Sequence, residues 1–198
     1  MGFLYATMEG KSYFCDSIFM KIEKTILDGV LIVEPDVYAD ERGYFFESFS
    51  QEKYQAAGIP VEQFVQDNVS KSKKGVLRGL HFQNEPMVQG KLVQVLRGKV
   101  LDVAVDIRKE SPTYGKYVAV ELSEKNHHQL WVPEGFAHGF LTLEDDTIFS
   151  YKVTAPYSKE HESGIRYDDP EIGIEWTMET TTLIVSEKDR ILPFLSEL

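Results

Sequence analysis

The sequence predicts an all-β protein, built as an antiparallel sandwich or jelly roll. Short apolar runs with a period of two follow one another from residue 20 onward, and Gly, Pro, Asn and Asp lie between them. Phe and Tyr, with 12 and 10 copies among 198 residues, add to the preference for strands. No strand–helix alternation supports a parallel α/β sheet.

Each expected element has its own local signal. The clearest is 92–108, where Val103 and Val105 alternate with Asp102 and Asp106 on the opposite face. The expected strands are 30–33, 43–49, 61–69, 76–83, 92–108 with a turn at 97–98, 116–122, 128–132, 140–143 and 147–154. Short helices are expected at 51–57 and within 180–198, and a turn-rich loop at 133–139.

Charge and cysteine content narrow the function classes. With 21 basic and 32 acidic residues, the chain carries a net charge of −11, which argues against non-specific nucleic-acid binding and against a polybasic membrane binder. Cys15 is the single cysteine and has no internal partner, so a reducing, cytoplasmic location is expected. No apolar run is long enough to span a membrane. We expect one domain over 20–198, preceded by an N-terminal extension of unknown role at 1–19.

The segment 70–83 concentrates basic and polar side chains in this acidic chain. Its three lysines are best explained as a solvated loop, but Arg78 lies in an apolar strand and suits an anion. His81 is either a general base or a hydrogen-bonded core histidine. Strict alternation makes Arg78 and His81 face apart, although Gly79 between them is a common marker of a bulge.

Three further side chains have both a structural and a functional interpretation. His138, in the turn-rich loop, either contacts a ligand or caps a turn. Tyr151 alternates with Phe149 and is either a core tyrosine or a general acid. Tyr157 follows a proline and either packs or stacks on a flat ring.

No metal or cofactor site is predicted. Jelly-roll metalloenzymes usually carry His-x-His, whereas His81 is followed by Phe82 and Gln83. The adjacent pair His127 and His128 would point to opposite faces of a strand. A glycine-rich phosphate loop and the Gly-x-Ser-x-Gly motif are also missing.

A set of motifs resembles one known family in order along nearly the whole chain, from about residue 20 to 189. They are DERGYFFE at 40–47, FVQDN at 64–68, GVLRGLHFQ at 75–83, QGK at 89–91, VAVDIRKESPT at 103–113, QLWVPEGFAHGF at 129–140 and YKVT at 151–154. Together they resemble the dTDP-4-dehydrorhamnose 3,5-epimerase family.

The resemblance implies a cupin-type antiparallel jelly roll with a few short helices. It implies a homodimer with strand exchange that works without metal or cofactor. The implied substrate is a dTDP-4-keto-6-deoxy sugar, whose C3 and C5, both next to the C4 ketone, are inverted. A reductase would then convert the product to dTDP-L-rhamnose.

The resemblance also assigns four catalytic residues. His81 matches the base that removes a proton next to the ketone, and Asp189 matches the carboxylate that orients it. Lys91 matches a cation near the C4 oxygen, and a donor of this kind typically contributes roughly 3–4 kcal/mol. Tyr151 matches the acid that returns a proton from the opposite face; an unperturbed phenol has a pKa of about 10 and is protonated at neutral pH.

Nine further positions match residues that bind substrate in the family. They are Arg42, Glu47, Gln66, Asn68, Arg78, His138, Tyr157, Glu162 and Lys188. Tyr157 matches a ring that stacks on thymine, and the early residues Arg42, Glu47, Gln66 and Asn68 are expected to reach across a dimer. Since Arg78 and His81 both belong to the implied site, the resemblance predicts a bulge or twist at Gly79.

Three alternatives stay open at this point. Relatives with the same four residues act on other nucleotide 4-keto sugars or invert only one carbon. A metal-dependent cupin isomerase or oxygenase would bind metal and lose activity to a chelator. A non-catalytic nucleotide-sugar binding module would bind ligand without exchanging protons at the sugar carbons.

Overall fold

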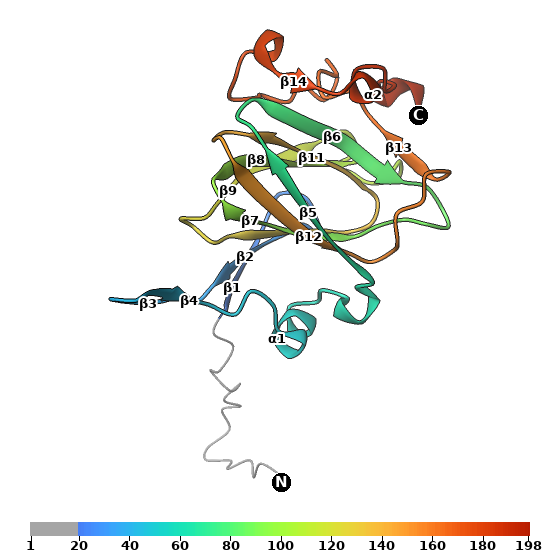
Figure 1. Cartoon of the computed structure of the whole chain (residues 1–198). Helices are drawn as coiled ribbons and strands as arrows, with labels where there is room; N and C mark the ends of the chain where they lie inside the picture. The colour runs from blue at the N-terminus through green and yellow to red at the C-terminus, as the bar shows by residue number, and fades with distance from the viewer. Residues whose placement is uncertain (1–19) are drawn as a thin grey trace.

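Two β-sheets packed face to face form the body of the protein (Figure 1). The computed structural model describes residues 20–198; the expected extension at 1–19, with Cys15, lies outside the described residues. The first sheet has the order β1 (Met20–Lys24), β2 (Leu31–Pro35), β10 (Gln129–Val132), β7 (Lys91–Arg97), β12 (Thr147–Val153) and β5 (Gln66–Ser72). The second has the order β13 (Glu162–Gly164), β6 (Val76–Gln83), β11 (Phe136–Thr142), β8 (Lys99–Asp106) and β9 (Tyr117–Ser123).

Neighbouring strands within both sheets run antiparallel, and the one parallel pairing joins β14 (Ile184–Val185) to β6. The helices are short: α1 (Gln51–Ala56), α2 (Glu187–Arg190) and the 3-10 turns η1 (Val61–Gln63), η2 (Thr180–Thr182) and η3 (Leu195–Glu197). None of the helices in residues 20–198 is long and apolar enough to cross a bilayer. The predicted all-β jelly roll with few short helices is therefore confirmed.

The core lies between the two sheets and joins residues from both. Phe140 of β11 stacks on Phe149 of β12 with ring centroids 4.1 Å apart, and Val93, Leu130 and Leu122 are buried around them. Because these side chains occupy every second position of their strands, the period-two pattern builds one face of each sheet.

Two expectations about local structure were wrong. The loop expected at 133–139 is a turn only as far as Gly135, and Phe136 begins strand β11, whose residues are all buried. Residues 61–69 were expected as one strand, but they begin with η1 and become strand only at Gln66. The cause in β11 is burial on both faces, which removes the polar alternation that marks a half-exposed strand.

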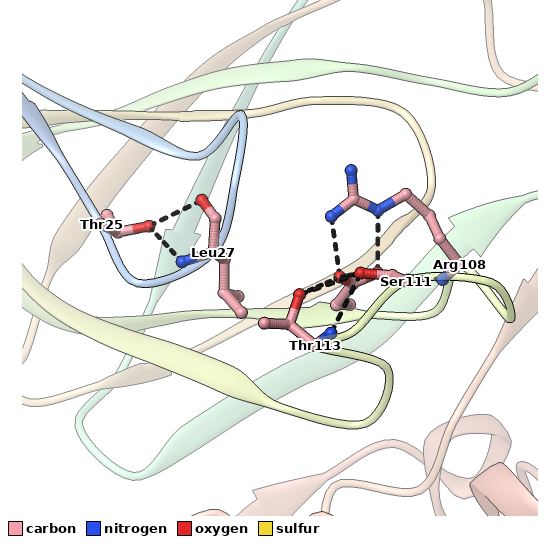
Figure 2. A network of polar contacts seen from close by, with 6 residues as sticks. Thr25, Leu27, Arg108, Ser111 and Thr113 are labelled. Atoms are coloured by element: carbon pink, nitrogen blue, oxygen red, sulfur yellow. Dashed lines mark hydrogen bonds and ion pairs between the residues drawn. The ribbon is translucent and has the colours of Figure 1, made fainter.

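Strand β8 shows the same effect with charged residues. Its alternation places Asp102 and Asp106 opposite Val103 and Val105, yet all four are fully buried. Asp106 accepts hydrogen bonds from Arg108 Nε (2.9 Å), Ser111 Oγ (2.6 Å) and Thr113 Oγ1 (2.6 Å). Figure 2 shows these three partners gathered in the loop after β8. Asp106 thus organises a turn rather than facing solvent.

A two-stranded arm stands away from the sandwich (Figure 1). It consists of β3 (Tyr38–Asp40) and β4 (Gly43–Phe45), and it exposes 57% of Tyr38 and 66% of Phe45. The strand expected over 43–49 therefore ends at Phe45.

Candidate active site

A cleft of about 320 Å³ opens between the two sheets. Strands β5, β7 and β12 line it from one side, and β6 and β13 from the other. Seven of the predicted site residues line it: Gln66, Asn68, His81, Lys91, Tyr151, Tyr157 and Glu162. The remaining lining residues, which the sequence had not singled out, are Phe82, Gln83 and Gln89.

His81 and Asp189 form a hydrogen-bonded pair at this cleft. The distance from His81 Nε2 to Asp189 Oδ1 is 2.7 Å, and the side chains are 29% and 6% exposed. Burial alone would raise the pKa of Asp189, but the bonds from His81 and from the Gly79 N–H hold it below its usual range. An ionised Asp189 can only accept, so Nε2 of His81 carries a proton and Nδ1 is the nitrogen left to act as a base.

The local fold explains how a C-terminal residue reaches β6. Strand β14 runs parallel to the start of β6, with Val185 opposite Leu77. Directly after it, Ser186 caps α2 by accepting the N–H of Asp189 at 3.1 Å. The cap turns the chain so that Asp189, 4% exposed, is directed back at the strand that carries His81.

The predicted bulge at Gly79 is confirmed. In the β11–β6 pairing, His138 lies opposite His81 and Phe140 opposite Arg78, so β6 has one extra residue between the two pairs. Gly79 adopts φ +124°, and an added Cβ would lie 2.6 Å from Gly139 Cα. Only glycine fits this position.

Arg78, on the other side of this bulge, is exposed and donates from Nε to Ser72 Oγ at 3.2 Å. Its positive charge acts on Tyr151, which lines the same cleft as His81. The register shift at the bulge breaks the strict alternation that would make Arg78 and His81 face apart, although Arg78 is not among the residues that line the cleft.

Lys91 is buried at the base of the cleft. It is 9% exposed, and its Nζ donates to the carbonyl oxygen of His81 at 3.3 Å. Burial lowers its pKa to about 8, although the negative charges of Asp102 and Glu162 oppose that fall. A buried ammonium next to the base is suited to stabilise negative charge that develops on a bound oxygen.

Tyr151 reaches the cleft from the first sheet, opposite the strand of His81. Burial raises the pKa of its phenol, and the charge of Arg78 opposes part of that rise. The phenol is therefore protonated at neutral pH. Because His81 lies on β6 and Tyr151 on β12, a ring bound between the sheets has a base on one face and an acid on the other.

Tyr157 and Glu162, which line the cleft, form a connected group with Lys188. Tyr157 Oη donates to Glu162 Oε2 at 2.8 Å, and Lys188 Nζ lies 2.5 Å from the same oxygen. Burial would raise the pKa of Glu162, but these two donors hold it below its usual value. The hydrogen bond to Glu162 in turn raises the pKa of Tyr157.

Five predicted substrate contacts are not among the residues that line the cleft: Arg42, Glu47, Arg78, His138 and Lys188. Arg42 lies on the arm, paired with Asp40, and Glu47 follows the arm, paired with Lys53. His138 is 6% exposed, and its Nε2 lies 2.9 Å from Asp102 Oδ1.

Asp102 was not predicted as a site residue, because the alternation of its strand assigned it to the polar face. Gln83 carried a usable signal, since strict alternation sets it on the same face as His81. Among residues 20–198, no group of three or more His, Cys, Asp and Glu side chains is arranged to hold a metal ion.

The fold and the cleft together define a jelly-roll enzyme with an acid–base site suited to proton transfer at carbon. A family model described as dTDP-4-dehydrorhamnose 3,5-epimerase matches residues 24–197. The chain belongs to this family.

Individual relatives support the same assignment. The dTDP-4-dehydrorhamnose 3,5-epimerase of Methanothermobacter thermautotrophicus is 57% identical over 168 residues, covering 84% of this chain and 90% of the relative. That of Shigella flexneri is 55% identical, covering 86% and 93%. A crystal structure of dTDP-6-deoxy-D-glucose-3,5-epimerase from Legionella pneumophila, in complex with dTDP-4-keto-L-rhamnose, is 49% identical with a TM-score of 0.85, covering 89% and 93%.

Proposed function

We propose that this protein is a dTDP-4-dehydrorhamnose 3,5-epimerase. It inverts C3 and C5 of dTDP-4-dehydro-6-deoxy-D-glucose to give dTDP-4-dehydro-L-rhamnose, a step of dTDP-L-rhamnose biosynthesis. The observation that carries the proposal is the His81–Asp189 pair facing Tyr151 across one cleft, in a chain 57% identical to a curated epimerase.

The chemistry follows from these positions. Nδ1 of His81 takes the proton from the carbon next to the C4 ketone, and the electron pair of that C–H bond moves into an enolate. Lys91 stabilises the enolate oxygen. Tyr151 then donates its proton to the opposite face of the same carbon, which inverts it. The proton on His81 and the missing proton on Tyr151 re-equilibrate with solvent before the next turnover.

The protein residues supply the base, the cation and the acid, so we propose that the reaction needs no metal or cofactor. The remaining predicted residues, in the cleft and around it, bind the substrate. Tyr157, 56% exposed, presents its ring for stacking on thymine, while Gln66, Asn68, Arg78, His138, Glu162 and Lys188 contact the sugar or the diphosphate.

We further propose a homodimer in which the arm reaches the partner subunit's cleft. Arg42 and Glu47 match substrate-binding positions but lie outside their own cleft, and the arm exposes Tyr38, Tyr44 and Phe45. Mixing Arg42→Ala and His81→Ala subunits tests this. In a mixed dimer one site has both residues intact, so roughly a quarter of wild-type activity should return after subunit exchange. No recovery would contradict the exchanged arm.

We make two further proposals, on the domain boundary and on the cellular location of the protein. We propose that 20–198 acts as a single epimerase domain and that the enzyme is cytoplasmic, because a chain whose single cysteine is Cys15 suits a reducing compartment.

Proton exchange tests the activity directly. The protein is incubated with dTDP-4-dehydro-6-deoxy-D-glucose in heavy water, and C3 and C5 are followed by NMR. The proposal predicts deuterium at both carbons. Deuterium at one carbon alone would identify a monoepimerase instead, and binding without exchange would identify a non-catalytic module.

A further inference from the structure

The segment 154–158, which carries Tyr157, connects β12 to β13 along the rim of the cleft. Four backbone groups of this segment, one in each residue from 155 to 158, bond to glutamine side chains. Gln89 Nε2 donates to the Ala155 carbonyl (2.6 Å), and Gln83 Nε2 donates to the Pro156 carbonyl (3.1 Å). Gln66 Oε1 accepts the Tyr157 N–H (3.2 Å), and Gln83 Oε1 accepts the Ser158 N–H (2.7 Å).

These glutamine side chains take the place of the backbone hydrogen bonds that would hold segment 154–158 in a sheet. Within residues 20–198, none of those four backbone groups has a backbone partner. The segment is tied to β5 by Gln66, to the end of β6 by Gln83 and to the residue pair before β7 by Gln89. Three attachment points from three directions leave the backbone of Tyr157 little freedom to move.

The amides are themselves fixed in orientation. Gln83 is 6% exposed, and its Nε2 also donates to the Met87 carbonyl at 2.6 Å. Gln66 donates from Nε2 to Asn68 Oδ1 at 2.8 Å. Because each amide has a donor side and an acceptor side already engaged, neither can flip without losing bonds on both sides.

We infer that Gln83 and Gln89 are positioning residues that hold Tyr157 in place to bind the nucleotide part of the substrate. The inference rests on the proposed function, since it needs a nucleotide for Tyr157 to contact. Neither glutamine needs to touch the sugar carbons, so both act on substrate affinity and not on the proton-transfer step.

Binding of dTDP, measured by calorimetry, tests the inference with Gln89→Met, which removes one donor and keeps the side-chain length. The loss of one hydrogen bond should raise the Kd for dTDP about five- to tenfold. The exchange rate at saturating sugar nucleotide should stay within about twofold of wild type. Gln83→Met, which releases both Pro156 and Ser158, should weaken dTDP binding further. Gln55→Met makes the same chemical change on the exposed side of α1 and should alter neither quantity.

A double-mutant cycle with Tyr157→Ala separates positioning from general loosening of the fold. If Gln89 acts through Tyr157, Gln89→Met should change Kd by less than about twofold in the Tyr157→Ala background. Additive effects of the two substitutions would overturn the inference, as would unchanged dTDP affinity in Gln89→Met and Gln83→Met or in Tyr157→Ala. A wild-type protein that does not bind dTDP would instead overturn the proposed function.

Discussion

Asp106 and Asp189 are both buried carboxylates with several donors, yet they do different things. Asp106 is 0% exposed and bonds to Arg108, Ser111 and Thr113, all within seven residues of it (Figure 2). Asp189 is 4% exposed and bonds to groups more than a hundred residues away, the His81 ring and the Gly79 N–H.

The two carboxylates differ in whether their hydrogen-bond donors can also take part in chemistry. Burial would raise the pKa of Asp106, but its hydrogen-bond donors hold that pKa far below the ordinary value. All of these donors belong to one loop and bond to Asp106 itself. Asp189 instead bonds through Nε2 to a histidine that lines the cleft. A carboxylate with local partners fixes a turn, whereas one with a distant histidine partner fixes the tautomer of a base.

The contrast between Asp106 and Asp189 depends most on His81 being the base. We expect His81→Ala to reduce deuterium incorporation at C3 and C5 by about 10³-fold, within the usual range for a general base. The variant should stay folded but unfold at a lower temperature, because the buried Asp189 carboxylate loses its His81 partner. Exchange within tenfold of wild type would show that another group removes the proton.

Lys91 provides a second test of this contrast, because its ammonium is proposed to stabilise the enolate oxygen beside the Asp189–His81 pair. Lys91→Met should lower the exchange rate by about 10²- to 10³-fold, the usual effect of removing one such donor. Proton exchange at saturating substrate measures it. A variant that loses substrate affinity but keeps its exchange rate would restrict Lys91 to binding.

Gly79 lies between Arg78 and His81 on β6, and its substitution tests the bulge. Gly79→Ala would place a Cβ 2.9 Å from the His138 carbonyl oxygen at a φ of +124°, so we expect a loss of about 2–4 kcal/mol in unfolding free energy. Denaturant unfolding measures it. Gly173→Ala is a matched control, because it also has positive φ (+64°) but meets nothing closer than 3.9 Å. Equal losses in both variants would mean that φ alone, and not the bulge, sets the requirement.

The smallest expected effect is on the pH profile. Burial lowers the pKa of Lys91 to about 8, and the mechanism that we propose needs its charged form. Therefore kcat/KM should fall as the pH rises above about 8, and in Lys91→Arg this fall should move to higher pH, because a guanidinium does not titrate there. An unchanged alkaline limb in Lys91→Arg would assign that limb to another group.

Much of the fold was readable from the sequence because most strands are exposed on one face. Strand β6 has the predicted bounds, 76–83, and α1 and the C-terminal α2 were expected. One failure has a clear cause. In β11 both faces are buried, so the alternation that reports one solvent-facing side is lost. Strand β8 kept its alternation and was predicted, but Asp102 and Asp106 were set apart from the core although both are buried.

The cleft was predictable only where a residue type is chemically unusual in its strand. Arg78 and His81 stood out in an apolar segment, and Gly79 between them predicted the bulge that the structure shows. The pairing of His81 with Asp189 rested on family resemblance, because nothing local relates two residues 108 positions apart. Gln83 and Gln89 were missed, since a glutamine's function depends on which backbone groups lie opposite it, and the sequence does not show that.

The most direct test applies one substitution, Asp to Asn, to both carboxylates, and measures thermal unfolding and deuterium exchange on each variant. Asp189→Asn should remain folded and lose at least about 100-fold in exchange rate, because an amide no longer enforces the His81 tautomer. Asp106→Asn should lose about 3 kcal/mol of stability, roughly 10 °C in Tm, while the folded fraction keeps its exchange rate. The opposite result, a stable and inactive Asp106→Asn beside an active Asp189→Asn, would contradict the account.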